Sequence, residues 1–346
     1  MLAAVLGLGL TSGRPLANEK SLQPAATAST RKEGGVADAL MQRVHAVKEG
    51  VFSVVMIGDS TVRRPFLALI PFLDTLRSTP RQAVDTVISK LRLMDLPHWD
   101  GSHADEYSPV VDVETQRARV GEVEVVVTVV YQQKALLDMA ILGDVMHTLL
   151  EPQGAVPVPD VVLVGPSGMH HLTRFCCRSE TSRDWSILNY EQRLRDALSA
   201  VQEACPDAAL KAFTTHSVCN AKMDGHLDNG AGRERVLACA AGNTTGCFGP
   251  PRSQADEPYW EAMAADQLES FNASLWSSWG AENLVVRERA VLSEPAFSSR
   301  WEVVDGHSLT LGHCDETEDG DHYSERILEQ ELTLMLLPGA HGTDAS

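Results

Sequence analysis

The chain has 346 residues, 44% of them hydrophobic, which is enough for one large domain or two small ones. Its formal net charge of −18 argues against nucleic acid as a partner, because the phosphates would be repelled. No apolar run is long enough to cross a bilayer, so we expect no stable transmembrane span. The composition does not indicate an oligomeric state.

The N-terminal 38 residues differ from the rest of the chain. Residues 2–10 are apolar and resemble the core of a signal peptide, although a basic start is missing. Small and polar residues follow them. We predict that residues 1–38 are a leader or disordered segment, that residues 39–338 form a single domain, and that residues 339–346 are a tail.

Seven cysteines all lie after residue 175 and include no Cys-x-x-Cys pair, which makes a zinc ribbon or a thioredoxin-like site unexpected. Two glycosylation triplets begin at Asn243 and Asn272 and are compatible with passage through a secretory compartment. We therefore predict a location in the secretory pathway or outside the cell.

Apolar runs predict strands, and apolar residues spaced three to four apart predict helices. In chain order we predict a helix over 39–48, a strand over 51–57, helices over 65–76 and 82–93, a polar loop over 97–116, a strand over 123–131, a helix over 134–150, a strand over 158–164, a helix over 190–203, a strand over 208–215, a helix over 257–279, a strand over 301–304 and a helix over 324–337. Pro71 is expected to kink or restart the helix that contains it. Residues 220–258 interrupt the alternation and predict an insertion loop, for which a disulfide among Cys219, Cys239 and Cys247 is a candidate staple.

Strands that alternate with helices and are apolar throughout predict a three-layer α/β/α sandwich around a mainly parallel sheet. In such sheets the ligand site lies at the carboxyl ends of the strands. Polar residues follow four of the predicted strands: Ser60, the loop 165–171, Thr215 with His216, and the segment after Val304. This convergence predicts a site at one edge of the sheet.

Ser60 follows the first predicted strand in the sequence Gly58-Asp59-Ser60. A serine that opens a helix after a tight turn can act as a nucleophile, and its own N–H can hold an oxyanion. The alternative is an ordinary strand-to-helix turn in which Asp59 and Ser60 serve as caps.

Asp319 and His322 lie three residues apart just before the last predicted helix. At that spacing the carboxylate can hold the histidine Nδ1, so that Nε2 faces the serine as a general base. The alternative is an acidic surface turn that caps the last helix.

Gly58-Asp59-Ser60 and Asp319-x-x-His322 together resemble the SGNH (GDSL-type) hydrolase superfamily. Gly-Asp-Ser-x-x-Arg63 and the block from Phe213 to Cys219 are similar to its PC-esterase branch, which includes trichome-birefringence-like polysaccharide O-acetyltransferases and acyl esterases. The resemblance covers roughly residues 51–337 and implies a flavodoxin-like α/β fold. It also implies a triad of Ser60, His322 and Asp319.

The sequence departs from that pattern in the oxyanion hole. Pro166 occupies the position of the family's asparagine, and proline has no N–H to donate. We expect oxyanion or substrate contacts from Arg63, Gly168, His170 and Gln132 instead, with Ser167 a further candidate donor.

These features predict a serine-dependent acyl-ester hydrolase or O-acyltransferase without a cofactor, acting on an O-acylated, in particular O-acetylated, carbohydrate. The other hypothesis is an inactive glycan-binding or scaffold protein on the same fold. His170, His171, His216, His307, His313 and Cys314 lack a helical ligand spacing, so no metal site is expected.

Overall fold

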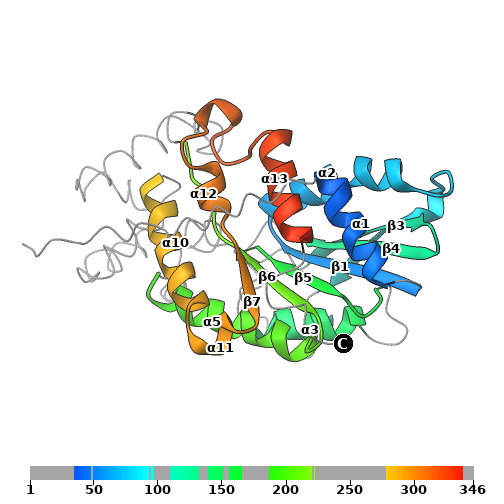
Figure 1. Cartoon of the computed structure of the whole chain (residues 1–346). Helices are drawn as coiled ribbons and strands as arrows, with labels where there is room; N and C mark the ends of the chain where they lie inside the picture. Colours follow the sequence, from blue (N-terminus) through cyan, green and yellow to red (C-terminus); the bar gives the residue numbers. More distant parts are fainter. Residues whose placement is uncertain are drawn as a thin grey trace, which may run out of the picture. The chain divides into compact units, whose positions relative to one another are not determined.

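The structure is a computed structural model that describes residues 35–47, 50–92, 95–96, 110–131, 139–150, 156–165, 187–219, 222 and 278–337. A seven-stranded mixed sheet lies between two layers of helices (Figure 1). The predicted α/β/α sandwich with a mainly parallel sheet is confirmed. Within the described residues, no helix combines the length and the apolar character needed to cross a membrane.

The elements have the following bounds. The strands are β1 (Gly50–Gly58), β2 (Thr86–Arg92), β3 (Val110–Val120), β4 (Val123–Tyr131), β5 (Val161–Val164), β6 (Ala209–Phe213) and β7 (Trp301–Val304). The helices are α1 (Val36–Val47), α2 (Ser60–Leu76), α3 (Met139–Leu150), α5 (Ile187–Ala204), α10 (Ser278–Leu292), α11 (Pro295–Ser298), α12 (Gly306–Thr310) and α13 (Glu325–Leu336), with 3-10 turns η1 (Ala83–Asp85) and η5 (Cys314–Glu316).

The strand order is β2-β3-β4-β1-β5-β6-β7. Strand β1 pairs in parallel with β4 and β5, and β6 pairs in parallel with β5 and β7. Strands β2 and β3 add an antiparallel edge. Since five adjacent strands run the same way, their carboxyl ends meet at one edge of the sheet.

Two hydrophobic cores cover the two faces of the sheet, and alternate residues of each inner strand point into them. In β1, Val55 and Ile57 pack in the core with α3 and α5. Val54 and Met56 of the same strand pack in the core with α1, α2 and α13. Both faces are apolar, which explains why the parallel strands are continuous apolar runs.

Helix α2 runs through both Pro65 and Pro71 without ending. Of the two expectations for Pro71, the restart is therefore wrong, while the kink stays a prediction. The apolar face of α2, with Val62, Phe66, Leu69 and Leu73 buried, holds the helix against the sheet.

Two predicted segments have a different structure. Within the predicted helix 82–93, residues 83–92 form η1 and strand β2 instead, and β2 pairs along its whole length with β3. Residues 110–116 of the predicted loop 97–116 belong to β3. The apolar side chains of 82–93 are β-branched in Val84, Val87 and Ile88, and all three are exposed at the sheet edge. The three-to-four spacing of these residues therefore does not correspond to the buried face of a helix.

Two cations hold the carboxyl end of α13, the helix that follows His322. The guanidinium of Arg43 donates to the carbonyls of Leu336 and Leu337 at 2.8 and 3.0 Å. The buried Nζ of Lys211 donates to the carbonyls of Leu334 and Leu337, both at 2.8 Å. Positive charge at a helix carboxyl end satisfies free carbonyls and complements the helix dipole.

We expect Lys211→Met to lower the free energy of unfolding by about 1–3 kcal/mol, because it removes the donor to the Leu334 carbonyl and leaves Arg43 as the donor to that of Leu337. Urea denaturation followed by circular dichroism measures the change. Lys90→Met on the exposed strand β2 is the matched control and should change stability little. Equal losses for the two variants would contradict this role of Lys211.

Candidate functional site

The turn from β1 to α2 places Ser60 at the carboxyl edge of the sheet. Asp59 is the N-cap of α2, and its Oδ1 accepts from the N–H and the hydroxyl of Thr61 at 2.9 and 2.7 Å. A Cβ on Gly58 would lie 2.5 Å from Cγ2 of Val62, so glycine is needed for this close approach of the helix. Asp59 supplies the cap, which leaves the Ser60 hydroxyl available for another partner.

That partner is His322. Its Nε2 lies 2.8 Å from Oγ of Ser60, and its Nδ1 lies 2.7 Å from Oδ2 of Asp319. Ser60 is half-buried, and the side chain of His322 is 10% exposed. The structure thus brings the three residues of the predicted triad into one hydrogen-bonded chain; their catalytic roles stay a prediction.

A tight turn holds Asp319 against His322. Gly320 has φ of +102°, a left-handed conformation that favours glycine. Oδ1 of Asp319 accepts a hydrogen bond from the N–H of His322 at 3.0 Å, while Oδ2 accepts one from Nδ1 of the same residue's ring. The N–H of Gly320 donates to Oγ1 of Thr317 at 2.9 Å. One carboxylate therefore fixes both the turn and the ring.

The surroundings in the turn shift the pKa values of both Asp319 and His322. Partial burial raises the pKa of the Asp319 carboxyl, but hydrogen bonds from the His322 ring and N–H outweigh it and lower that pKa. Burial lowers the pKa of His322, but Asp321 and then Asp319 outweigh it, so this pKa lies above 6.5. Arg64, 3.8 Å from Oδ2 of Asp319, opposes the rise.

A buried pair lies directly behind this turn. Nε2 of His216 is 2.8 Å from Oε1 of Glu331, and its Nδ1 is 3.3 Å from the carbonyl oxygen of Asp321. A carbonyl and an ionised carboxylate only accept hydrogen bonds, so this arrangement favours the imidazolium form of His216, with a proton on each ring nitrogen. Burial lowers the pKa of His216, but Glu331 and the Asp321 carbonyl outweigh it and raise that pKa above 6.5.

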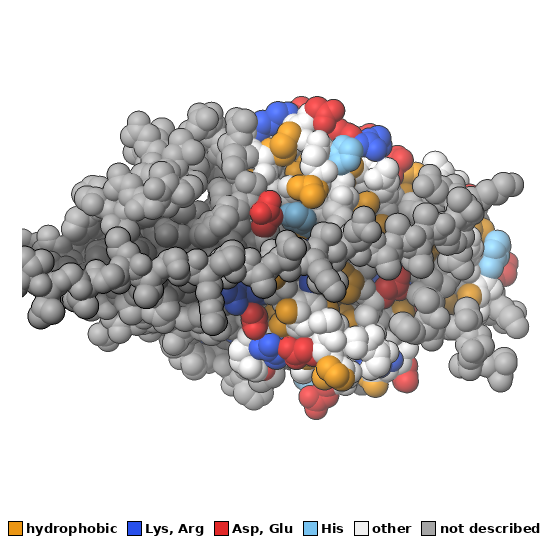
Figure 2. Space-filling view, turned by 60° about the vertical axis from the view of Figure 1, so that its left-hand side comes forward, with side chains coloured by type: hydrophobic (Ala, Val, Ile, Leu, Met, Phe, Trp, Pro, Cys, Tyr) orange, Lys and Arg blue, Asp and Glu red, His pale blue; other side chains and the backbone are white. Residues whose placement is uncertain are grey.

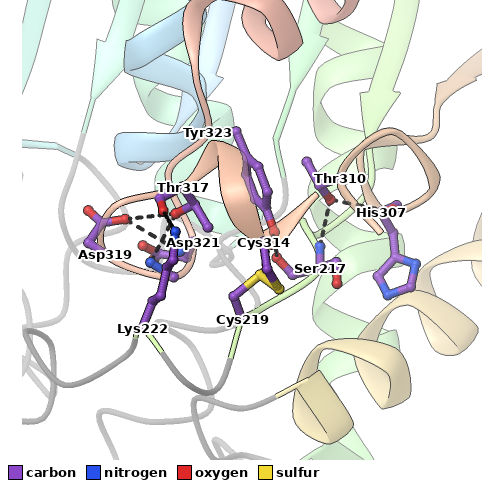
Figure 3. The surroundings of a disulfide bond; sticks show 11 residues. Ser217, Cys219, Lys222, His307, Thr310, Cys314, Thr317, Asp319, Asp321 and Tyr323 are labelled. Atoms are coloured by element: carbon purple, nitrogen blue, oxygen red, sulfur yellow. Dashed lines mark hydrogen bonds between the residues drawn. A yellow bond between two sulfur atoms is a disulfide. The ribbon is translucent and has the colours of Figure 1, made fainter. Parts of the chain in front are cut away.

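A disulfide and several hydrogen bonds join the segment after β6 (residues 214–222) to the turn that holds Asp319 and His322 (Figure 3). A disulfide joins Cys219 to Cys314, and the N–H of Cys219 donates to the carbonyl of Gly320 at 2.8 Å. The hydroxyl of Tyr323, the residue after His322, donates to the carbonyl of Ser217 at 2.7 Å. Nζ of Lys222 donates to the carbonyl of Thr317 at 2.5 Å. These bonds leave the turn little freedom to move away from Ser60.

The same segment is anchored at its start. The N–H and hydroxyl of Thr215 donate to the buried carboxylate of Glu288 on α10 at 2.8 and 2.6 Å. The hydroxyl of Tyr190 on α5 donates to the same carboxylate at 2.8 Å. Burial raises the pKa of Glu288 despite these donors. Helices α5 and α10 thereby hold the segment that holds the turn.

The other predicted site residues have different positions. The guanidinium of Arg63 lies 5.2 Å from the centre of the Tyr131 ring and 3.9 Å from Oε2 of Glu114, so it faces the ends of β3 and β4. Its part in oxyanion or substrate binding stays a prediction. Gln132, Gly168 and His170 lie outside the described residues, as do Pro166 and Ser167.

Two groups of described residues bring metal-ligating atoms within 4.8 Å of one another: His313, Asp315 and Glu316, and Asp319, Asp321 and His322. In the first, Glu316 already accepts from Arg326 and Ser324. The second contains the Asp319–His322 pair itself. His216 is bound to Glu331, and Cys314 is in a disulfide, so neither is available as a ligand.

Sequence reasoning missed several residues that support the site. Cys219 pairs with Cys314, so the candidate staple within 220–258 does not include Cys219, while Cys239 and Cys247 lie outside the described residues. The position of Cys314, five residues before Asp319, was a usable signal. Glu331 also gave a signal, because it is an acidic residue on the apolar face of a predicted helix.

We expect Glu331→Gln to destabilise the protein most at low pH. A raised pKa means that the His216 pair contributes its full stability below the ordinary value near 6.5, and loses it as pH rises through the higher folded value. Breaking a buried pair costs about 3–5 kcal/mol. Urea denaturation at pH 6 and at pH 9 should show a smaller loss at pH 9. Glu329→Gln, on the exposed face of α13, is the control, and a loss independent of pH would refute the charged pair.

Removing the disulfide should loosen the turn. We expect Cys219→Ser with Cys314→Ser to lower the free energy of unfolding by about 2–4 kcal/mol. Thermal unfolding with and without dithiothreitol provides the check, because the reductant should lower the melting temperature of the natural protein by more than that of the double variant. A natural protein that is insensitive to full reduction would contradict the expectation.

The similarity of this chain to known proteins is one of structure, and it is weak. No known family and no curated protein matches the sequence. Among solved structures, a peptidoglycan O-acetylesterase aligns with 87% of this chain and 93% of its own, at 10% identity and a TM-score of 0.32. The cytosolic domain of the T. maritima FeoB iron transporter aligns with 70% of this chain and 98% of its own, at 10% identity and a TM-score of 0.22. At such scores neither similarity carries an argument about function.

Proposed function

We propose that this protein is a serine-dependent acyl-ester hydrolase or O-acyltransferase. The observation that carries the proposal is the chain of hydrogen bonds from Ser60 Oγ through His322 to Asp319, at 2.8 and 2.7 Å. A serine hydroxyl needs an adjacent base to become a nucleophile at neutral pH, and an oriented histidine supplies one.

In the proposed reaction, Ser60 Oγ attacks the acyl carbon as its proton passes to Nε2 of His322. Asp319 keeps the proton on Nδ1 and stabilises the imidazolium. The ester bond then breaks, and the Nε2 proton goes to the departing alcohol oxygen. Water or a second alcohol next gives its proton to Nε2 and attacks the acyl-serine, which releases Ser60 with its proton restored.

The start of α2 supports this chemistry electrostatically. Ser60 is the first residue of the 17-residue helix, where N–H groups lack helical acceptors. The N–H groups of Val62 and Arg63 both donate to the Asp59 carbonyl, whereas that of Ser60 has no acceptor among the described residues. A developing oxyanion next to Ser60 would receive that N–H and the positive end of the helix dipole.

The proposed substrate is an O-acetylated carbohydrate. One face of the molecule carries acidic and basic side chains side by side on its described part, without a field of one sign (Figure 2). Such a surface suits a neutral glycan better than a strongly anionic partner. The Cys219–Cys314 disulfide supports the proposed secretory or extracellular location, since disulfides persist in oxidising compartments.

We expect Ser60→Ala to abolish labelling by a fluorophosphonate and to reduce turnover of p-nitrophenyl acetate by several orders of magnitude, as loss of a triad serine does. Ser89→Ala on the exposed strand β2 is the matched control and should keep full activity. Folded natural protein that neither reacts with the probe nor turns over the ester would overturn the proposal and favour an inactive glycan-binding protein.

Release of acetate from O-acetylated polysaccharides, measured with and without an acceptor glycan, separates the two activities. An acceptor that takes up the acetyl group while free acetate falls identifies a transferase. Unchanged acetate release identifies a hydrolase. Both activities use the same three side chains.

A further inference from the structure

A second carboxylate lies against the ring of His322. Oδ1 of Asp321 is 3.0 Å from Nδ1, the same nitrogen that Oδ2 of Asp319 approaches at 2.7 Å. The side chain of Asp321 is 5% exposed, whereas that of Asp319 is 32% exposed. The better buried of the two carboxylates is thus the one that the Asp-x-x-His spacing does not single out.

The two contacts differ in kind. Asp319 makes the aligned hydrogen bond to Nδ1 and also holds the N–H of His322. Asp321 lies at ion-pair distance from the ring. Because Asp321 is buried, solvent and salt screen its attraction for a protonated ring less than they would screen that of an exposed carboxylate.

The position of Asp321 is fixed from behind. Its carbonyl faces the imidazolium of His216, which is held in turn by Glu331. The carbonyl of Gly320, immediately before it, accepts the N–H of disulfide-bonded Cys219. The bonds on both sides of Asp321 prevent the residue from swinging out to solvent, as an acid in a free surface turn would do.

We propose that Asp321 is a second positioning carboxylate for His322, which stabilises the imidazolium formed during acyl transfer and keeps the ring oriented when Asp319 is lost. The inference rests on the proposed function, in which His322 is the general base. Asp321 would then be a fourth member of the site, and it would share Nδ1 of His322 with Asp319.

The proposal has a consequence for pH. The charged groups that face His322 are Asp319 and Asp321 from its own turn and Arg64 from α2, which opposes them. His322 must be neutral to accept the serine proton, so activity falls as pH drops through its pKa. Removing a nearby negative charge disfavours the imidazolium, and the acid limb of the rate profile then moves to lower pH.

The test compares Asp321→Asn, Asp319→Asn and the double variant. We expect Asp321→Asn to move the acid limb of kcat/KM for p-nitrophenyl acetate down by about one pH unit. Either single substitution should cost well under the roughly 10⁴-fold in kcat that follows loss of a sole orienting carboxylate, and the double variant should reach it. Glu318→Gln removes the same charge from an exposed position of the same turn and should leave the profile unchanged.

A nuclear magnetic resonance titration of the His322 ring, assigned with His322→Gln, decides the matter without any turnover. A ring pKa in Asp321→Asn equal to that in Glu318→Gln overturns the proposal, even if the protein is an esterase. A lowered ring pKa supports the contact, even if no ester is hydrolysed. Activity that is lost on treatment with EDTA and restored by Zn²⁺ or Mn²⁺ would also overturn it, because Asp319, Asp321 and His322 would then be cation ligands.

Discussion

The hydrogen bond between Ser60 Oγ and His322 Nε2 joins residues 262 positions apart in the chain. The length of this bond depends on the whole sheet. Ser60 lies just after β1, at the start of α2, and His322 lies beyond the last strand, β7. Parallel pairing sets the two ends at one edge of the sheet. A change of register in any of these strands would move one partner relative to the other and break the bond.

Strand pairing alone leaves the turn 317–323 free, because this turn belongs to no strand ladder of the sheet. The structure compensates with bonds from the segment after β6: a disulfide, backbone and side-chain donors, and the imidazolium of His216. Buried polar groups of this kind are costly when they are only partly satisfied and rigid when they are satisfied. The position of the turn beside Ser60 is therefore set by residues that do not touch Ser60.

Local patterns were sufficient to predict the sandwich and most of the elements, because each depends on residues close together in sequence. The grouping of Ser60 with Asp319 and His322, 262 positions apart for the serine and the histidine, came instead from the resemblance of their two short motifs to a known family. The helix expected over 82–93 failed because most of β2 is exposed, and the apolar spacing of Val84, Val87 and Ile88 corresponds to no buried face. Long-range pairs were out of reach for a different reason. Cys314 and Glu331 stood out by their positions in the sequence, but only the folded sheet shows that Cys219 and His216 are their partners.

The carboxylate of Asp321 adds a second negative charge beside the ring of His322. With His322 neutral, Asp319 and Asp321 place two negative charges around one uncharged ring in a half-buried turn, and like charges repel. The surrounding groups reduce that cost: Arg64 lies near Asp319, and the imidazolium of His216 lies behind Asp321. Protonation of His322 relieves the remaining repulsion. In the proposed ester reaction, the imidazolium formed there would gain more from its environment than it would in a triad with a single carboxylate, and the gain would come in the transition state, where it increases the rate.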